Sequence, residues 1–471
     1  MPIVHWFRRD FRLHDNTALW HACRDSGGGI IPVFVFDDAI LRHPDCGAPI
    51  VRFMLDCLVE LRKSLRAEGG DILLLHGKPL EKLRKIARQT GATAIYYNKD
   101  YAPAAVERDV AIEEALIADG ITVRGFKDQV IFEEQEICTL SGGLPYTVYT
   151  PYKNAWLKKM QQRPIEVLGK PKLKFAKSMR ALKGVPMPTA GELGFQSNHQ
   201  IDIHAGERAA LRQLTAFCRK KLQDYQTDRN FPAIDGSSRL SPHLRHGTLS
   251  PRQCTDAALK TRSGGADAWI GELIWRDFYQ QVLFNFPRVE HEPFKPNLTR
   301  LKWRQSKRDF KRWADGMTGY PIVDAAMRQL NQTGWMHNRL RMIVAMFLTK
   351  DLLLDYRLGE RYFMQNLIDG DTAQNNGGWQ WSASTGTDAQ PYFRIFNPTA
   401  QGEKFDPKGA FIRRYCPELA NIPDQFIHCP RTMPPAEQRR IRFRMGIDYP
   451  FPMVDHAEAR VRALGMFQKS R

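Results

Sequence analysis

The first 130 residues switch repeatedly between two hydrophobic periods, and this alternation constrains the fold more than any other feature of the chain. Short apolar runs rich in β-branched and aromatic residues alternate with charged segments of helical spacing, such as 52–68 and 80–89. Such repeats predict a parallel sheet covered by helices on both faces, with ligands bound beyond the carboxyl ends of the strands. The expected strands are residues 3–6, 30–36, 72–76, 94–98 and 121–126.

The remainder of the chain has a different pattern. Residues 160–205 combine prolines and lysines with little periodicity, which indicates a long connection. From residue 207 onward the pattern is helical, and Ser241-Pro242 and Ser250-Pro251 each place a capping hydroxyl before a proline, which is typical of a helix start. We therefore expect an α/β domain with a Rossmann-like, doubly wound parallel sheet over residues 1–130, a linker over 131–205 and a larger all-α domain over 206–471.

The chain is basic. It has 69 Lys and Arg residues against 51 Asp and Glu residues, a formal net charge of +18. Such a charge admits a polyanionic partner, because neutralised phosphates release counterions. Residues 288–312 concentrate nine basic residues against three acidic ones, interleaved with aromatic residues. Composition leaves open whether this run contacts nucleic acid or forms a solvated helix face.

Several functional classes find no support in the sequence. No run of about 20 apolar residues is present, and Arg8 interrupts the start of the chain before a signal-type apolar run could form. We therefore expect a cytoplasmic protein. Neither a nucleophile elbow nor HExxH occurs, and the acids at 369–371 lack His or Cys partners at ligand spacing, so we expect no metal site.

Tryptophan is concentrated in the helical half, where seven of the ten lie between residues 269 and 381. Most tryptophans pack in protein cores, but these have unusual neighbours. Helical spacing of three and four is expected to align one set of residues on one side of a helix: Trp269, Glu272, Trp275, Arg276 and Tyr279. A face that carries aromatic rings, one acid and one base indicates a site more than a plain core stripe.

Two further runs share this character. One aligns Trp335, Asn338 and Met342, and the other, residues 369–381, holds two acids, two amides and two tryptophans, Trp379 and Trp381, that must point in different directions. An aromatic, amide-rich site without a nucleophile suits a bound organic cofactor that carries the reaction. Its phosphates would fit the hydroxyls and helix start at 237–242.

The longest of these motifs resemble the photolyase and cryptochrome family. They are ELIWRDFY (272–279), TGYPIVDAAM (318–327), GWMHNR (334–339), NNGGWQW (375–381) and WFRRDFRLHDN (6–16). The resemblance runs essentially end to end and is closest to the bacterial class I cyclobutane pyrimidine dimer (CPD) photolyases. It implies a carbon–carbon lyase in which excited, reduced FAD donates an electron to a CPD lesion flipped out of DNA, so that the dimer splits.

The resemblance also implies residue roles. FAD-binding positions are Tyr225, Ser237, Ser238, Arg239, Leu240, Ser241, Trp269, Arg341, Asp369, Gly370, Asp371 and Asn375. Asn375 would lie beside the reactive flavin nitrogen N5, whereas Asp369 could equally serve mainly as the ion-pair partner of Arg341.

A second set of residues would hold the lesion and its DNA. Catalytic positions are Glu272, Trp275, Asn338, Met342 and Trp381, and further DNA contacts are Arg229, Arg276, Tyr279, Arg339 and Gln401. Family members that act on (6-4) photoproducts carry histidines at the positions of Asn338 and Met342, so this pair favours the CPD. A (6-4) photolyase, a cryptochrome-type photoreceptor and a basic DNA-binding protein without catalysis are the alternatives. We expect a monomer without an obligate protein partner or a membrane.

Two positions depart from the family pattern. The photoreduction chain, usually three tryptophans, reads Trp379, Tyr356 and Trp303, which predicts a slower middle step or a detour through Trp313. In the antenna site, folate-binding relatives carry Asn-Glu where this chain has alanines, and Asp100 resembles a contact of deazaflavin-binding relatives. A second chromophore of the deazaflavin (8-HDF) or folate (MTHF) type is expected, and its identity stays open.

Overall fold

A computed structural model describes residues 1–139 and 142–469. The N-terminal region is an α/β domain built around a five-stranded sheet of order β3-β2-β1-β4-β5. Its elements are β1 (Ile3–Phe7), α1 (Thr17–Asp25), β2 (Ile30–Phe36), α2 (Asp38–Leu41), α3 (Ala48–Ala67), β3 (Leu73–His76), α4 (Pro79–Thr90), β4 (Ala94–Asn98), α5 (Pro103–Ala118) and β5 (Thr122–Phe126). All four strand pairings are parallel, so the expected strands and the doubly wound sheet are confirmed.

Alternate residues of each strand serve the two faces of the sheet. Phe7 and Phe34 face one core with α1 and α3, whereas Trp6 and Val33 face the other core with α4 and α5. Strands buried on both faces read as continuous apolar runs, and this is why they are recognisable in the sequence.

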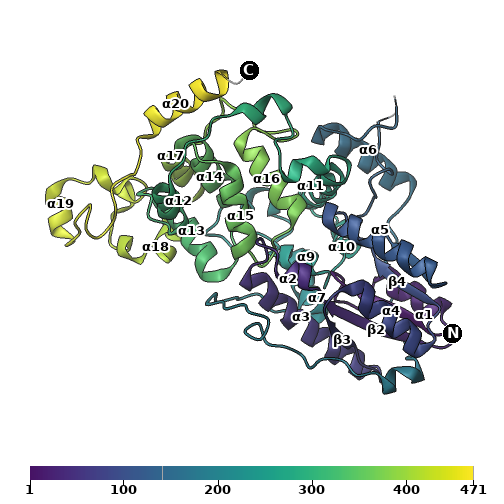
Figure 1. Cartoon of the computed structure of the whole chain (residues 1–471). Helices are drawn as coiled ribbons and strands as arrows, with labels where there is room; N and C mark the ends of the chain where they lie inside the picture. The colour runs from purple at the N-terminus through teal and green to yellow at the C-terminus, as the bar shows by residue number, and fades with distance from the viewer. Residues whose placement is uncertain (140–141, 470–471) are drawn as a thin grey trace.

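The second region is helical (Figure 1). Its helices are α6 (Tyr149–Gln162), α7 (Glu207–Lys220), α8 (Tyr225–Asp228), α9 (Ser241–His246), α10 (Pro251–Thr261), α11 (Ala266–Asn285), α12 (Lys307–Ala314), α13 (Pro321–Thr333), α14 (Asn338–Met346), α15 (Tyr356–Asn366), α16 (Thr372–Ala383), α17 (Pro398–Phe405), α18 (Ala410–Tyr415), α19 (Pro435–Arg440) and α20 (His456–Gln468). Single turns of 3-10 helix lie at Lys177–Ala181, Pro287–Glu290, Pro296–Arg300, Pro417–Leu419, Asp424–Phe426 and Pro430–Thr432, and α14 continues into a π-helical turn, Phe347–Asp351.

The segment between the two regions is only partly an extended connection. Residues 131–205 include α6, which buries Tyr152 and Trp156 against α11 in the core of the helical region. The stretch that follows runs along the α/β domain, where the Ala176 N–H donates to Ile30 O and the Val185 N–H to Leu74 O. The linker expected over 131–205 therefore contributes a helix to the helical region before it crosses back over the sheet.

The two predicted helix starts differ. Ser250 is the N-cap of α10 and forms a complete capping box with Gln253, as expected. Ser241 is instead the first residue of α9, Leu240 occupies the N-cap position, and no side chain caps this helix. The Ser241 prediction is therefore wrong by one position, because a hydroxyl inside the first turn no longer faces the unpaired amides.

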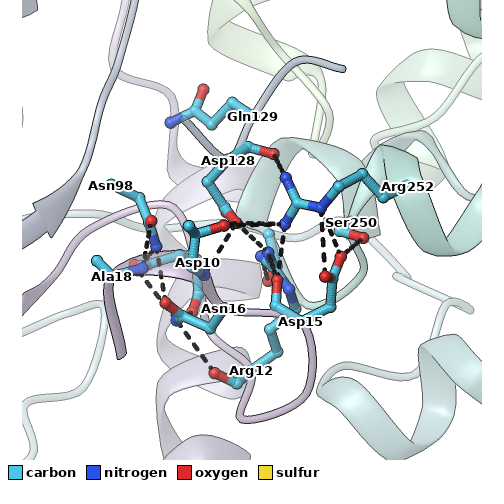
Figure 2. A network of polar contacts seen from close by, with 12 residues as sticks. Asp10, Arg12, Asp15, Asn16, Ala18, Asn98, Asp128, Gln129, Ser250 and Arg252 are labelled. Atoms are coloured by element: carbon cyan, nitrogen blue, oxygen red, sulfur yellow. Dashed lines mark hydrogen bonds and ion pairs between the residues drawn. The ribbon is translucent and has the colours of Figure 1, made fainter. Parts of the chain in front are cut away.

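A buried charge network joins the two regions (Figure 2). Arg252 of α10 reaches the carboxylates of Asp15 and Asp128, at 2.9 and 2.8 Å, and Arg12 also binds Asp128. The two carboxylates are almost completely buried. Two arginines thus balance two aspartates at the interface, and the helical region supplies one of these four charges.

Candidate functional site

A cavity of about 420 Å³ opens into the helical region, bounded by α11, α14 and α16. All five predicted catalytic residues line it, together with five predicted cofactor-binding residues and three predicted DNA contacts. These thirteen residues are Glu272, Trp275, Asn338, Met342, Trp381, Arg341, Asp369, Gly370, Asp371, Asn375, Arg229, Tyr279 and Arg339. Residues that lie more than 150 positions apart in the chain therefore meet in one hollow.

The α11 wall of the cavity is narrower than the sequence predicted. Glu272, Trp275 and Tyr279 line the cavity, whereas Trp269 packs against Phe217 in the core and the Arg276 guanidinium donates to Gln129 O. At about 100° per residue, the first three lie within about 60° of one another, and Trp269 and Arg276 fall on an adjoining stripe. The five residues thus lie on one side of α11, within about 120°, but Trp269 and the buried Arg276 do not line the cavity.

An ion pair stands at the mouth of the cavity. Arg229, which directly follows α8, lies 2.7 Å from the Glu272 carboxylate, and both side chains are about one-third exposed. Glu272 is thus held by a cation from a different element.

The α14 wall begins with an imidazole cap. His337 is the N-cap, and its side chain accepts a hydrogen bond from the Arg339 N–H, so Asn338 and Met342 are oriented from the first turn onward. Burial lowers the pKa of His337 to about 4, with the charges of Arg339 and Arg341 adding to the effect. The neutral imidazole is the form that can accept this hydrogen bond.

Arg341, also on α14, pairs with Asp369 at 2.8 Å. This is the ion pair that the sequence left as an alternative role for Asp369. Arg339 donates to Asn230 Oδ1 at 2.5 Å, and its guanidinium lies over the Phe405 ring of α17.

The α16 wall starts at Asp371, which caps the helix by accepting from the Gln374 N–H. Arg9, from the α/β domain, binds Asp371 as well as Asp100. Burial alone would raise the pKa of Asp371, but nearby guanidinium groups, Arg9 and Arg245 first among them, hold it below its usual value. The start of α16 is therefore anchored to the other domain.

Further along α16, the Asn375 amide donates to Glu360 O at 2.8 Å. Trp379 is buried and Trp381 is partly exposed, and both rings line the cavity. The buried Trp379 indole N–H has no hydrogen-bond partner among the described residues.

The aromatic residues behind the cavity form two contacts. Trp303 and Tyr356 lie with ring centroids 6.3 Å apart, and Trp313 lies 6.1 Å from Trp379. Burial raises the pKa of Tyr356 above its ordinary range, and its hydroxyl has no partner in the described chain. The first step of the predicted detour, from Trp379 to Trp313, and the last step of the direct route, from Tyr356 to Trp303, therefore each have a ring contact.

Other predicted site residues lie outside the cavity lining, and each has a distinct environment. Tyr225 packs on Phe217, as Trp269 does. Arg239 pairs with Asp202 and covers the Trp335 ring. The remaining ones are Ser237, Ser238, Leu240, Ser241 and Gln401 around α9 and α17, Trp303 and Tyr356 behind the cavity, and Asp100, whose carboxylate binds Arg9.

Seven further lining residues had not been singled out: Asn230, Ala345, Phe363, Leu367, Gln374, Gly378 and Ser382. Gln374, Gly378 and Ser382 continue the spacing of Asp371 along one side of α16, so extending that period would have found them. Asn230 comes from the turn after α8 and Phe363 from α15, and no local pattern marks them.

Within residues 1–139 and 142–469, no group of three or more His, Cys, Asp and Glu side chains is arranged to hold a metal ion. Over the same residues, no helix has the length and apolarity needed to cross a membrane.

Comparisons with known proteins assign this arrangement, an α/β domain joined to a helical domain that holds the cavity, to the class of FAD-binding proteins related to DNA photolyase. The protein-family model described as the FAD binding domain of DNA photolyase matches residues 269–469, and the family model described as DNA photolyase matches residues 3–172. The chain belongs to the photolyase/cryptochrome family.

Individual relatives match over the full length. A protein of Salmonella typhimurium named deoxyribodipyrimidine photo-lyase is 42% identical, with 99% of this chain and 98% of the relative covered. A crystal structure of a class III photolyase from Agrobacterium tumefaciens aligns with a TM-score of 0.91 at 37% identity, over 100% of this chain and 97% of that one. An archaeal photolyase from Sulfolobus tokodaii, described with two FAD molecules, aligns with a TM-score of 0.84 at 32% identity, with both chains fully covered. Because one of these relatives is a class III enzyme, membership of class I stays a prediction.

Proposed function

We propose that this protein is a deoxyribodipyrimidine photolyase, a lyase that uses light to split cyclobutane pyrimidine dimers in DNA. One observation carries the proposal: a single cavity joins the residues predicted to bind the lesion with those predicted to bind FAD. The relative from Salmonella typhimurium that bears this name matches along the whole chain.

The cavity fits a flavin. Its walls combine aromatic, amide and charged side chains, and the indole N–H of the buried Trp379 has no partner among the described residues, so a polar group of the cofactor could bind there. Arg341, Asp369, Gly370, Asp371 and Asn375 are the residues that would hold the cofactor there. Bound FAD, reduced and excited by light, supplies the electron that opens the dimer.

The chain itself binds, orients and shields the lesion. The partly exposed rings of Trp275 and Trp381 offer apolar surfaces to a flipped-out dimer. The Glu272 carboxylate and the Asn338 amide supply hydrogen-bonding groups for the base edges, and the Met342 side chain packs without competing for them. Arg229 and Arg339, at the same cavity, are placed to neutralise flanking phosphates.

The proposal is tested by light-dependent repair of a defined lesion. The chemically reduced protein is mixed with an oligonucleotide that carries one thymine dimer, and repair is followed under blue light and in the dark. We expect repair only in the light, and Trp275→Ala to weaken binding to the dimer. Repair of (6-4) photoproducts but not of CPDs would replace the subclass, and light-induced FAD chemistry without any repair would favour a photoreceptor.

Three finer properties are proposed with the function. A second, light-harvesting chromophore accompanies FAD, as the two FAD molecules of the Sulfolobus tokodaii photolyase illustrate, and its identity is open between deazaflavin, folate and another flavin. The protein acts as a monomer without an obligate partner, because one chain contains the whole cavity. It acts in the cytoplasm, where the DNA of such a cell lies.

A further inference from the structure

Trp275 does not stand alone on the cavity wall. Tyr149, the first residue of α6, stacks on it with ring centroids 3.6 Å apart and an angle of 7° between the ring planes. One face of the Trp275 indole is therefore already covered by the protein.

Hydrogen bonds hold Tyr149 in this position from two sides. Its hydroxyl donates to Gly271 O at 2.7 Å, one turn before Trp275 on α11. Its backbone N–H donates to Asp388 Oδ2 at 3.2 Å. Thr387, next to Asp388, donates to the carbonyl of Thr147.

These bonds tie together the two walls that carry the lesion-binding tryptophans. The α11 wall carries Trp275. Residues 384–390 follow α16, the wall that carries Trp381. They remain next to Trp381, because the Gln390 N–H donates to Trp381 O at 3.3 Å. Residues 147–149 thus form a strap from one tryptophan wall to the other.

We propose that Tyr149 is a positioning residue for lesion recognition, a role that rests on the proposed photolyase function. The stacked phenol ring, together with the rings of Phe278 and Tyr279, holds the Trp275 indole in one rotamer before DNA arrives, so that the part of it that lines the cavity is ready to receive the flipped-out dimer. Without Tyr149, the partly exposed indole can move into the space that the phenol leaves, and part of the binding free energy is used to reorder it.

The stack also predicts which binding step changes. Undamaged DNA is held through phosphates and does not enter the cavity, so the order of Trp275 affects only lesion-containing DNA. A bound dimer meets the same flavin in the variant, so electron transfer after binding is unaffected.

The experiment compares three variants of the full, FAD-loaded protein. Tyr149→Leu removes the ring, Tyr149→Phe keeps the ring and removes the hydroxyl, and Tyr146→Leu removes a nearby ring that packs on Tyr152 and not on Trp275. Dissociation constants are measured in the dark for a thymine-dimer oligonucleotide and for its undamaged counterpart. Repair per absorbed photon is measured at saturating DNA.

We expect Tyr149→Leu to weaken binding to the dimer oligonucleotide by about three- to tenfold, the range of an aromatic stacking contribution. Binding to undamaged DNA and repair at saturation stay at the wild-type level. Tyr149→Phe and Tyr146→Leu behave like the wild type. FAD content and thermal midpoint show whether each variant is folded, and Tyr149→Met, which also lacks the ring, replaces the leucine variant if that one is not.

Several results would overturn the proposal. An unchanged preference for the dimer in Tyr149→Leu, or an equal loss for undamaged DNA, would show that the stack does not serve lesion recognition. An equal loss in Tyr149→Phe would assign the effect to the hydroxyl and Gly271 and not to the ring. If the wild type itself shows no preference for the dimer, that result contradicts the proposed photolyase function, whereas a preference that persists in Tyr149→Leu contradicts only the role of Tyr149.

Discussion

Replacing Arg252 by Met tests the interface between the two domains most directly. The variant keeps an unbranched side chain but removes one of the two cations that face Asp15 and Asp128. The side chains of these aspartates are 0% and 1% exposed and that of Arg252 is 11% exposed, so water cannot replace the lost partner without opening the interface. Removing one partner of a buried ion pair typically costs about 3–5 kcal/mol.

The exposed interdomain ion pair supplies the matched control. Arg361 of α15 lies 3.3 Å from Asp45 of the α/β domain, with the two side chains 64% and 34% exposed. Arg361→Met removes the same charge from the same interface, and the expected loss is about 0–1 kcal/mol because water screens the pair. The difference between the two variants in lost unfolding free energy therefore measures the effect of burying the ion pair.

Urea unfolding and native-state hydrogen exchange measure the effect. Because a two-domain protein need not unfold in one step, exchange of the amides of α10 reports opening of the interface separately from global unfolding. Arg252→Met should unfold at lower urea and exchange faster in α10, whereas Arg361→Met should resemble the wild type. Equal behaviour of the two variants would refute the reasoning.

The same network predicts an acid response. Burial alone would raise the pKa of Asp128, but Arg12 and Arg252 lower it to about 2 from an ordinary 3.8. This depressed pKa stabilises the folded protein above pH 3.8, and the contribution is lost as the pH falls toward 2. At about 1.4 kcal/mol per pKa unit it amounts to about 2–3 kcal/mol, and Arg252→Met should reduce it. An identical acid dependence of the unfolding free energy in both proteins would contradict this.

Three further predictions concern the cavity. Burial lowers the pKa of His337 to about 4, so its contribution to the free energy of unfolding is complete above pH 6.5 and is lost as the pH falls toward 4. About 3 kcal/mol of the unfolding free energy should disappear over this range. His337→Asn can still cap a helix and should remove this pH dependence in urea titrations. Tyr356→Trp should accelerate photoreduction of bound FAD in time-resolved absorbance, because the buried phenol has no described partner to take its proton; an unchanged rate would contradict the reasoning. Arg339→Met should weaken DNA binding and reduce the slope of log affinity against log salt by about 0.9, and an unchanged slope would show that Arg339 neutralises no phosphate.

Strands β1 to β4 were predictable because they are largely continuous apolar runs, as parallel strands buried on both faces require. Strand β5, at the edge of the sheet, is more polar and more exposed. Helix α6 was missed although Tyr149, Tyr152, Trp156 and Met160 follow helical spacing, because no capping side chain marks its start and three lysines interrupt its apolar residues. Position 241 shows a finer limit, since a serine before a proline is compatible with both the N-cap and the first turn.

The helical spacing of several site residues could be recognised in the sequence, but their contacts with residues of other elements could not. Glu272, Trp275 and Tyr279 follow one helical stripe, and sequence periodicity blurred this stripe with the adjoining one. The link from Arg9 to Asp371 joins residues 362 positions apart and exists only because the two domains pack together. No local pattern encodes such a contact.

The ion pair between Arg229 and Glu272 has a consequence for the search along undamaged DNA. A bare carboxylate at the mouth of the cavity would repel the passing phosphates, whereas a paired one presents no net charge to them. Because both side chains are about one-third exposed, water screens the pair in part, and losing this partner costs less than breaking a fully buried ion pair. If the proposed function holds, Glu272 would stay paired with Arg229 along undamaged DNA and would exchange this partner only where a base edge is offered.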